Sequence, residues 1–332
     1  MRPITRAFNR REFVRTVSAG LALVPVLNAD GLAQILTPRR SRVALVRTPD
    51  RKRGISEALK LLDLRGVAGK RVVLKPNFNS ADETPASTHN DTLTQLVTEL
   101  NERGARSITL GESSGPPVTK GVMEKKGVLD LARDQHFDIV NFEEIAERDW
   151  VAFGAAGTHW PDGFRLPRLV VDSEYMVSTC CLKTHAAGGV FTMSLKLSVG
   201  LSPKPLRRTM HSSPDIRRMI AELNTGYRPN LIVLDGVAAF TDGGPSRGEL
   251  KAGNVIIAGD DRVAVDAVGL AMLKSLGANQ AIMGRGIFQQ EQIARAVELK
   301  LGASGPDAID IVTADAESRA CADALRTILA QG

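Results

Sequence analysis

The chain has 332 residues, of which 43% are hydrophobic and 24% charged, and its formal net charge is +6. This length fits one large domain or two modest ones, and the hydrophobic fraction excludes a wholly disordered chain. No apolar run reaches the roughly 20 residues that a membrane helix needs. Three cysteines cannot form a disulfide framework, and 4% aromatic residues disfavour a stacking surface for single-stranded nucleic acid.

The first residues have the pattern of an export signal. Arg10, Arg11 and Arg15 precede a mild apolar stretch over residues 16–27 that is rich in small side chains. Paired arginines before such a stretch resemble a bacterial twin-arginine signal, with residues 1–33 as the signal and 34–41 as a linker. We therefore expect a periplasmic or otherwise exported protein that meets the twin-arginine export machinery and has no membrane span after cleavage. The alternative is an amphipathic helix that stays attached.

The positive charge is concentrated in this leader. Residues 1–33 hold five arginines against two acids, which is half of the formal charge. The remaining chain shows one basic cluster, formed by Lys204, Arg207 and Arg208. A nucleic-acid partner is not expected, because such binding needs positive charge gathered over a folded surface.

Beyond the leader, short β-branched runs alternate with helical patterns. Strands are predicted at residues 43–48, 71–75, 107–110, 138–142, 169–171, 175–180, 231–234, 255–258 and 309–312, and helices at 55–62, 92–103, within 121–135, and at 215–223, 262–276 and 289–299. This alternation predicts an α/β fold: a mixed, mostly parallel sheet with helices on both faces, in Rossmann-like layers but without the G-x-G-x-x-G dinucleotide fingerprint. We expect a single domain over residues 42–315, with an inserted loop or small hairpin at 143–168, and a C-terminal helix over 316–332.

Polar side chains stand directly after most of the predicted strands. They are Lys75, Asn77 and Asn79 after the second strand, Glu112 after the third, Lys183 and His185 near residue 180, and Asp235 after the next. Ligands of such sheets bind beyond the carboxyl ends of the strands, so we expect a site at this edge. A merely solvated edge would also be polar. However, Lys183, His185 and Asp235 stand against long apolar runs, where a charge needs a partner or a shifted pKa.

The segment from residue 182 to 196 has the composition of an anion cradle. Gly188 and Gly189 lie in a loop between a predicted strand and a helix start that Thr192 or Ser194 would cap. Backbone N–H groups at a helix start, glycines that permit close approach, and two flanking lysines suit a phosphate or carboxylate. The alternative is a loop whose glycines only turn the chain, with its lysines in solvent.

A divalent metal would need ligands from distant segments. The candidate set is His89, Glu112, His185 and Asp235. A lone histidine is more often a hydrogen-bonded structural residue than a ligand. No cysteine spacing for an iron–sulfur cluster occurs, so we do not expect such a cluster.

Two further patterns receive minor interpretations. Cys180 and Cys181 stand in one predicted strand, which turns their side chains to opposite faces, and we expect both to be small buried residues. The run Gly111-Glu112-Ser113-Ser114-Gly115 comes near the nucleophile elbow of serine hydrolases, with Ser113 as the nucleophile. Two prolines follow at once, so a helix there would begin late.

Several short motifs form an ordered set along the chain. They are Lys75-Pro76-Asn77, Gly111-Glu112-Ser113, Leu182-Lys183-Thr184-His185, Ser194-Leu195-Lys196, Leu234-Asp235-Gly236 with Gly243-Gly244-Pro245, and Asp261-Arg262-Val263-Ala264-Val265-Asp266. Together they resemble the bacterial and archaeal family called domain of unknown function 362, over about residues 42–315. The resemblance implies a fold and site positions rather than a reaction. Several relatives carry a ferredoxin-like cysteine module that this sequence lacks, and Leu197-Ser198 stands where the family is expected to have asparagine after the lysine.

These observations favour an exported enzyme with a small anionic substrate. Lys75, Lys183 and Lys196 would hold the anion, and a set of acid–base groups or metal ligands would comprise Glu112, His185 and Asp235. A lysine such as Lys183, crowded by other cations, can have a lowered pKa and act as a base or an imine-forming nucleophile. The alternatives are a non-catalytic periplasmic binding or accessory protein for a redox or metal system, and a structural partner of a redox complex.

Overall fold

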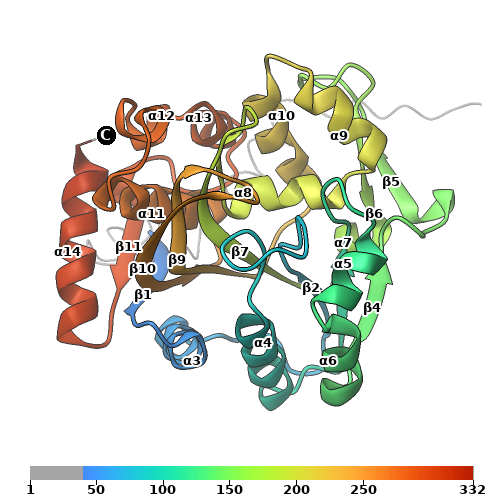
Figure 1. Cartoon of the computed structure of the whole chain (residues 1–332), viewed down its shortest axis with the longest axis horizontal. Helices are drawn as coiled ribbons and strands as arrows, with labels where there is room; N and C mark the ends of the chain where they lie inside the picture. The colour runs from blue at the N-terminus through green and yellow to red at the C-terminus, as the bar shows by residue number, and fades with distance from the viewer. Residues whose placement is uncertain (1–39, 332) are drawn as a thin grey trace, which may run out of the picture. The chain divides into compact units, whose positions relative to one another are not determined.

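The computed structural model describes residues 40–331, so the expected export signal and most of the predicted linker lie outside the described residues. The described chain forms one nine-stranded, mostly parallel sheet with helices on both faces, which confirms the predicted α/β fold (Figure 1). Over residues 40–331, no helix has the length and apolarity needed to cross a membrane.

The strand order across the sheet is β11-β1-β10-β9-β7-β2-β3-β4, and β8 pairs with β7. The bounds are β1 Ser41–Arg47, β2 Arg71–Lys75, β3 Ser107–Glu112, β4 Asp138–Asn141, β7 Tyr175–His185, β8 Val190–Thr192, β9 Leu231–Gly243, β10 Gly248–Gly259 and β11 Ile309–Val312. β10 runs antiparallel between β1 and β9, whereas β9, β7, β2, β3 and β4 are parallel neighbours. A separate hairpin of β5 (Trp150–Phe153) and β6 (Phe164–Pro167) forms within the predicted insertion.

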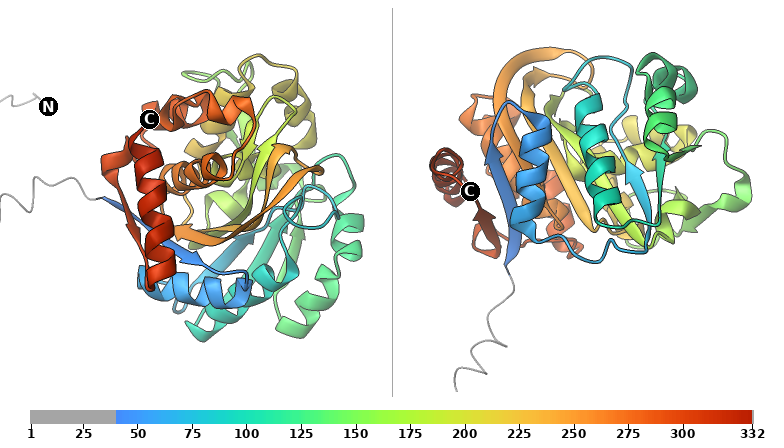
Figure 2. Two further views of the ribbon diagram at one scale, coloured as in Figure 1. Left: turned by 60° about the vertical axis from the view of Figure 1, so that its left-hand side comes forward. Right: turned by 90° about the horizontal axis from the view of Figure 1, so that it is seen from below.

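Helices cover both faces of the sheet (Figure 2). One face carries α3 (Arg51–Leu62), α4 (Asn90–Glu102) and α6 (Val128–Gln135), and the other carries α11 (Arg262–Ser275), α13 (Glu291–Glu298) and α14 (Ala316–Ala330). Because side chains alternate along a strand, Val43 and Leu45 of β1 pack with the second group, whereas Ala44 and Val46 pack with the first. A third apolar cluster packs α10 (Ile216–Leu223) against the β5–β6 hairpin.

Some predicted elements differ from the structure. Residues 169–171, predicted as a strand, form the short helix α7 (Arg168–Val171), since a brief apolar run has no distinguishing period. The helix predicted within 121–135 is divided into α5 (Thr119–Lys125) and α6, because Gly127 adopts a left-handed φ of 67° between them. β7, β9 and β10 extend beyond their apolar cores, because backbone pairing continues through the polar residues that follow.

Several short elements lie at the edge of the sheet where β2, β3 and β7 end. α8 (Ser194–Leu197) follows β8, and α9 (Lys204–His211) follows α8 along the same side of the molecule (Figure 1). The tip of the β9–β10 ribbon lies beside the end of β7, where the Ala186 amide donates to the Gly244 carbonyl at 3.2 Å. This arrangement brings four separate stretches of chain around one space. The remaining described α-helix, α12 (Gln280–Met283), contacts β8, and the Asn279 amide just before it donates to the Thr241 carbonyl of β9 at 2.8 Å.

Candidate functional site

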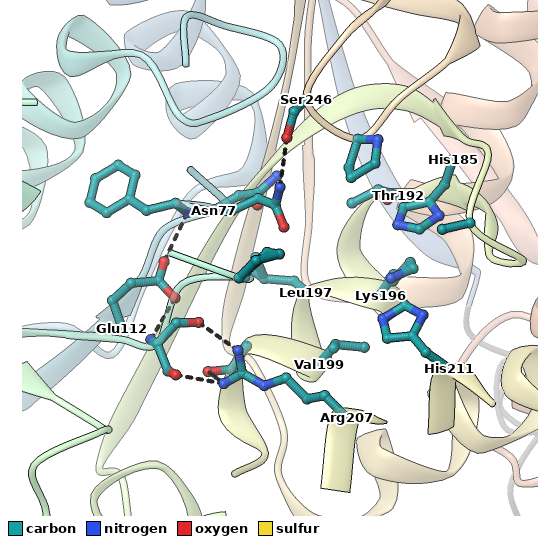
Figure 3. Close-up of a pocket in the computed structure, with 18 of the residues that line it drawn as sticks. Asn77, Glu112, His185, Thr192, Lys196, Leu197, Val199, Arg207, His211 and Ser246 are labelled. Atoms are coloured by element: carbon teal, nitrogen blue, oxygen red, sulfur yellow. Dashed lines mark hydrogen bonds between the residues drawn. The ribbon is translucent and has the colours of Figure 1, made fainter. Parts of the chain in front are cut away.

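A cavity of about 750 Å³ opens at the carboxyl edge of the sheet (Figure 3). Its walls come from the ends of β2 and β3, from β7 and β8, from α8 and α9, and from the tip of the β9–β10 ribbon. The cationic side chains that line it are Lys75, Lys183, Lys196, Lys204, Arg207 and Arg208. Among the described residues, Glu112 is the one acidic side chain in the lining.

Lys75 and Glu112 form a buried pair where β2 and β3 end. Lys75 Nζ lies 2.6 Å from Glu112 Oε1 and 2.5 Å from the Pro76 carbonyl. Glu112 also accepts the amides of Phe78 and Ser113, at 2.9 and 2.7 Å. The pair is therefore satisfied within the protein. Its charges cancel, and Lys204 is paired with Glu143 at 2.6 Å, so among the described residues the positive charges of Lys183, Lys196, Arg207 and Arg208 are left without an ion-pair partner.

Arg207 on α9 connects that helix to the end of β3. Its Nη1 donates to the Ser113 and Ser114 carbonyls at 3.2 and 2.6 Å, and its Nη2 donates to Ser113 Oγ at 2.6 Å. Burial lowers the pKa of Arg207 to about 10, although Glu112 opposes the shift. Since its acceptors here are neutral, Arg207 fixes the wall and also keeps a positive charge near the cavity.

Lys183 and Lys196 differ in what their amines contact. Lys183 Nζ donates to the carbonyls of Ala86 and Pro245, at 2.5 and 3.2 Å, and burial lowers its pKa to about 8. Lys196 Nζ has no hydrogen bond or ion pair within the described chain, although its side chain is only 6% exposed. Burial, followed by the charges of Lys183 and Arg207, lowers the pKa of Lys196 to about 7.

Two histidines lie beside Lys196. The rings of His185 and His211 are nearly parallel, with centroids 6.3 Å apart. Burial lowers the pKa of His185 to about 2, and Lys196 and His211 add to the shift, so this imidazole is neutral at physiological pH. Burial also lowers the pKa of His211. Figure 3 shows both rings and Lys196 on one side of the cavity and Glu112 on the other, with Leu197 and Val199 between.

Three buried polar atoms of the lining have no hydrogen-bond partner. They are Asn77 Nδ2, His185 Nδ1 and Thr192 Oγ1, on side chains that are 8%, 6% and 7% exposed. An unpaired buried polar group costs roughly 1–3 kcal/mol. Together with the Lys196 amine, these atoms form an unsatisfied set of the kind that a polar ligand would complete.

The structure brings most of the predicted site residues to this cavity. Lys75, Asn77, Asn79, Glu112, Lys183, His185, Thr192 and Lys196 all line it. Asp235 does not, because it falls on the same face of β9 as Val233 and points toward α3 and α4. There it accepts from Arg51 Nε and Thr92 Oγ1, both at 2.8 Å. The structure therefore places Asp235 away from the cavity and does not support the catalytic role predicted for it.

The predicted four-residue metal site does not assemble. His89 caps α4 by accepting the Asp91 amide at 3.0 Å, Glu112 pairs with Lys75, and Asp235 pairs with Arg51. Over residues 40–331, no group of three or more histidine, cysteine or carboxylate side chains is placed to hold a metal ion. His185 is the one member of the predicted set that keeps an unpaired atom in the cavity.

The structure does not support the anion cradle predicted at the start of α8. Asp266 of α11 already accepts the amides of Ser194 and Leu195, at 2.7 and 2.9 Å, so neither Thr192 nor Ser194 caps the helix. Burial raises the pKa of Asp266 to about 7. Gly188 and Gly189 turn the chain between β7 and β8 and do not line the cavity, but Lys183 and Lys196 are buried and not in solvent as the alternative interpretation expected.

The structure also bears on the Cys180–Cys181 pair and on the serine motif at residues 111–115. Cys180 and Cys181 are fully buried, as predicted, and burial raises the pKa of the Cys181 thiol to about 11. Ser113 follows β3, but α5 begins only at Thr119, and the Ser113 hydroxyl accepts from Arg207 and has no hydrogen bond to a histidine among the described residues. The structure therefore contradicts a nucleophile elbow at this position.

Sequence reasoning did not place α9 at the site. Lys204, Arg207, Arg208 and His211 lie at positions i, i+3, i+4 and i+7, which is one face of a helix, and all four line the cavity. This helical spacing of basic residues is the sequence signal that could have indicated a charged helix face at the site. Ser246, at the ribbon tip, was also missed; it accepts from Asn79 Nδ2 at 3.0 Å.

Comparisons with known proteins identify relatives of this chain. A family model described as domain of unknown function (DUF362) matches residues 72–271, a range that contains every residue named above in the cavity wall. The thylakoid-associated protein sll1697 of Synechocystis sp. (strain ATCC 27184 / PCC 6803 / Kazusa) is 26% identical over 210 residues, which cover 60% of this chain and 62% of that protein. The chain thus matches less than two thirds of that relative's length. The lactate racemase apoprotein from Thermoanaerobacterium thermosaccharolyticum aligns over 87% of this chain and 86% of its own, with 13% identity and a TM-score of 0.44.

Proposed function

This chain belongs to the family described as domain of unknown function (DUF362). We propose that it is an enzyme that binds a small anionic molecule in the cavity at the sheet edge. One observation carries this proposal: the Lys196 side chain is 6% exposed, its amine has no hydrogen bond or ion pair among the described residues, and the same cavity holds the unpaired polar atoms of Asn77, His185 and Thr192. Proteins rarely leave such groups unsatisfied unless a ligand or water completes them.

The charge of the cavity favours an anion. Lys183 and Arg207 donate to neutral oxygens, and Glu112, the one carboxylate among the described lining residues, is already paired with Lys75. Bringing an anion into this space replaces like-charge repulsion with attraction, and the interaction is stronger in a buried site than in water. An anion would also raise the pKa of Lys196, so binding would take up a proton near neutral pH.

The enzymatic part of the proposal rests on Lys196 and His185. A pKa of about 7 suits an amine to give and take protons at neutral pH. The neutral His185 imidazole can accept at one nitrogen and donate at the other. In this proposal, Glu112 and Lys183 hold the geometry and the charge of the site and do not react.

Calorimetric titration with inorganic phosphate, acetate and pyruvate tests the binding step. We expect at least one of these anions to bind, and Lys196→Met to weaken its affinity at least tenfold, which is about 1.4 kcal/mol. Lys70→Met is the matched control, since Lys70 is exposed just before β2, at the opposite edge of the sheet. Absence of binding by all three anions, or equal affinity in both variants, contradicts the proposal.

We also propose that the protein is exported through the twin-arginine route. The support is the sequence of residues 1–33, with its paired arginines and apolar stretch. A protein exported by this route crosses the membrane already folded, so the cavity would be complete before it reached the periplasm.

A further inference from the structure

We propose that Lys196 forms an imine with the carbonyl carbon of a small oxo acid, a molecule that carries a ketone or aldehyde group next to a carboxylate. The inference rests on the proposed function, because it names the reacting group and the ligand class of the same cavity. The three buried lysines that line the cavity differ in what their amines contact.

Imine formation needs a nitrogen lone pair that faces open space. Lys75 Nζ is held by Glu112 and the Pro76 carbonyl, and Lys183 Nζ by the carbonyls of Ala86 and Pro245. Over residues 40–331, the Lys196 amine has no such contact, and it faces the 750 Å³ cavity. Of the three, Lys196 is the amine that can reach a carbonyl without breaking an existing contact.

The surroundings of Lys196 also keep its amine reactive. Burial disfavours the charged ammonium form of Lys196, and the positive charges of Lys183 and Arg207 disfavour it further. At neutral pH roughly half of the molecules therefore hold a neutral amine. In an ordinary exposed lysine, only about one amine in 2,500 is neutral at that pH.

Proton transfer has a partner in His185. A Cβ atom at Gly189 would lie 2.6 Å from Lys196 Cε and 3.3 Å from His185 Nδ1, so the two side chains pack against the same spot of backbone. In the step we propose, the Nζ lone pair adds to the carbonyl carbon and forms the C–N bond. Both amine protons move to the carbonyl oxygen, which leaves as water when the C=N bond forms. The neutral His185 Nδ1 can accept a hydrogen bond from the amine as its protons pass to the oxygen, and no oxidant or reductant is needed.

The carboxylate of the oxo acid accounts for the rest of the site. It would be attracted by the charges of Lys183 and Arg207 and can accept from the unpaired Thr192 hydroxyl or Asn77 amide. Leu197 and Val199 offer an apolar wall for a short carbon chain. A simple phosphate would use the charge but would leave the nucleophilic amine without a role.

Borohydride trapping tests the imine. The full chain is incubated at neutral pH with pyruvate or glyoxylate, reduced with sodium borohydride, and examined by intact mass and peptide mapping. We expect one adduct per chain, at Lys196, with the mass of the oxo acid less one water plus two hydrogens. Lys196→Met is expected to lose the adduct, and Lys70→Met to retain it. Excess acetate, which has the carboxylate but no reactive carbonyl, is expected to reduce the yield in the wild-type chain.

The outcomes separate this inference from the proposed function. Saturable binding of pyruvate or acetate without an adduct at Lys196 overturns the imine and leaves anion binding standing. Neither binding nor adduct overturns both. Adducts spread over surface lysines, at the same yield in Lys196→Met, also overturn the imine. Trapping of Lys183 instead of Lys196 would overturn the assignment of the reacting residue.

Discussion

Replacing the Lys196 amine with the methyl group of methionine changes stability in a way that depends on pH. Folding lowers the pKa of Lys196 from 10.5 to about 7. Between these values the unfolded chain binds a proton that the folded chain does not, so the wild-type free energy of unfolding decreases as pH falls toward 7. Lys196→Met has no titrating group at this position, so its free energy of unfolding does not decrease for this reason. We expect Lys196→Met to be more stable than wild type at pH 7 by about 3–5 kcal/mol.

Denaturant unfolding across pH checks this expectation. The advantage of Lys196→Met is expected to shrink as pH rises above 7 and to vanish near the unfolded pKa, because both states then hold a neutral amine. Lys70→Met, at an exposed position, is expected to track the wild type at every pH. If Lys196→Met were less stable than wild type at pH 7, the amine would have a counter-charge that the structure does not contain.

At the scale of elements, the approach of the β7–β8 turn to α8 depends on Gly189. A Cβ there would lie 2.6 Å from Lys196 Cε, which is the movable end of a side chain rather than backbone. We therefore expect Gly189→Ala to fold with a stability within about 1 kcal/mol of wild type, because Gly189 has no positive φ, but to push the Lys196 amine aside. Anion affinity, and trapping by pyruvate, are expected to fall several-fold.

Gly121→Ala is the matched control for this change. Gly121 lies in α5, and a Cβ there would meet no atom within 4 Å. Thermal unfolding and calorimetric titration of both variants separate a local shift from a loss of fold. Unchanged affinity in Gly189→Ala would show that Lys196 is not held where the ligand binds.

The elements also show how far sequence reasoning reaches. Alternating strand and helix patterns predicted the sheet, and the strand-end rule predicted that Lys75, Glu112 and His185 would gather at one edge. Neither could predict that β7 would continue to His185, because that length depends on pairing with β8 and β9. Asp235 was misplaced for a related reason: the face of a strand end follows from the register of the whole strand.

At the scale of the whole molecule, the cavity combines segments from Lys75 to Ser246. Contacts such as the one between Arg207 and Ser113 join residues that are 94 positions apart. Local patterns carry no information on such pairs, so the helical spacing of basic residues in α9 could indicate a charged face but not what it faces. Asp266, which caps α8, is 72 positions away from Ser194, so local sequence patterns could not predict this contact either.

Export is a property of the entire chain, because the twin-arginine route would carry the finished fold. We expect the full chain, produced in a bacterium with this route, to appear in the periplasmic fraction, and a variant with Arg10→Lys and Arg11→Lys to stay in the cytoplasm. Lysine keeps the positive charge, so the double variant tests the arginine pair itself and not the charge of the leader. The retained protein is expected to bind anions as wild type does, since the cavity lies entirely within residues 75–246. Equal export of both chains would point to another route, and retention of both would mean that this leader does not act as an export signal.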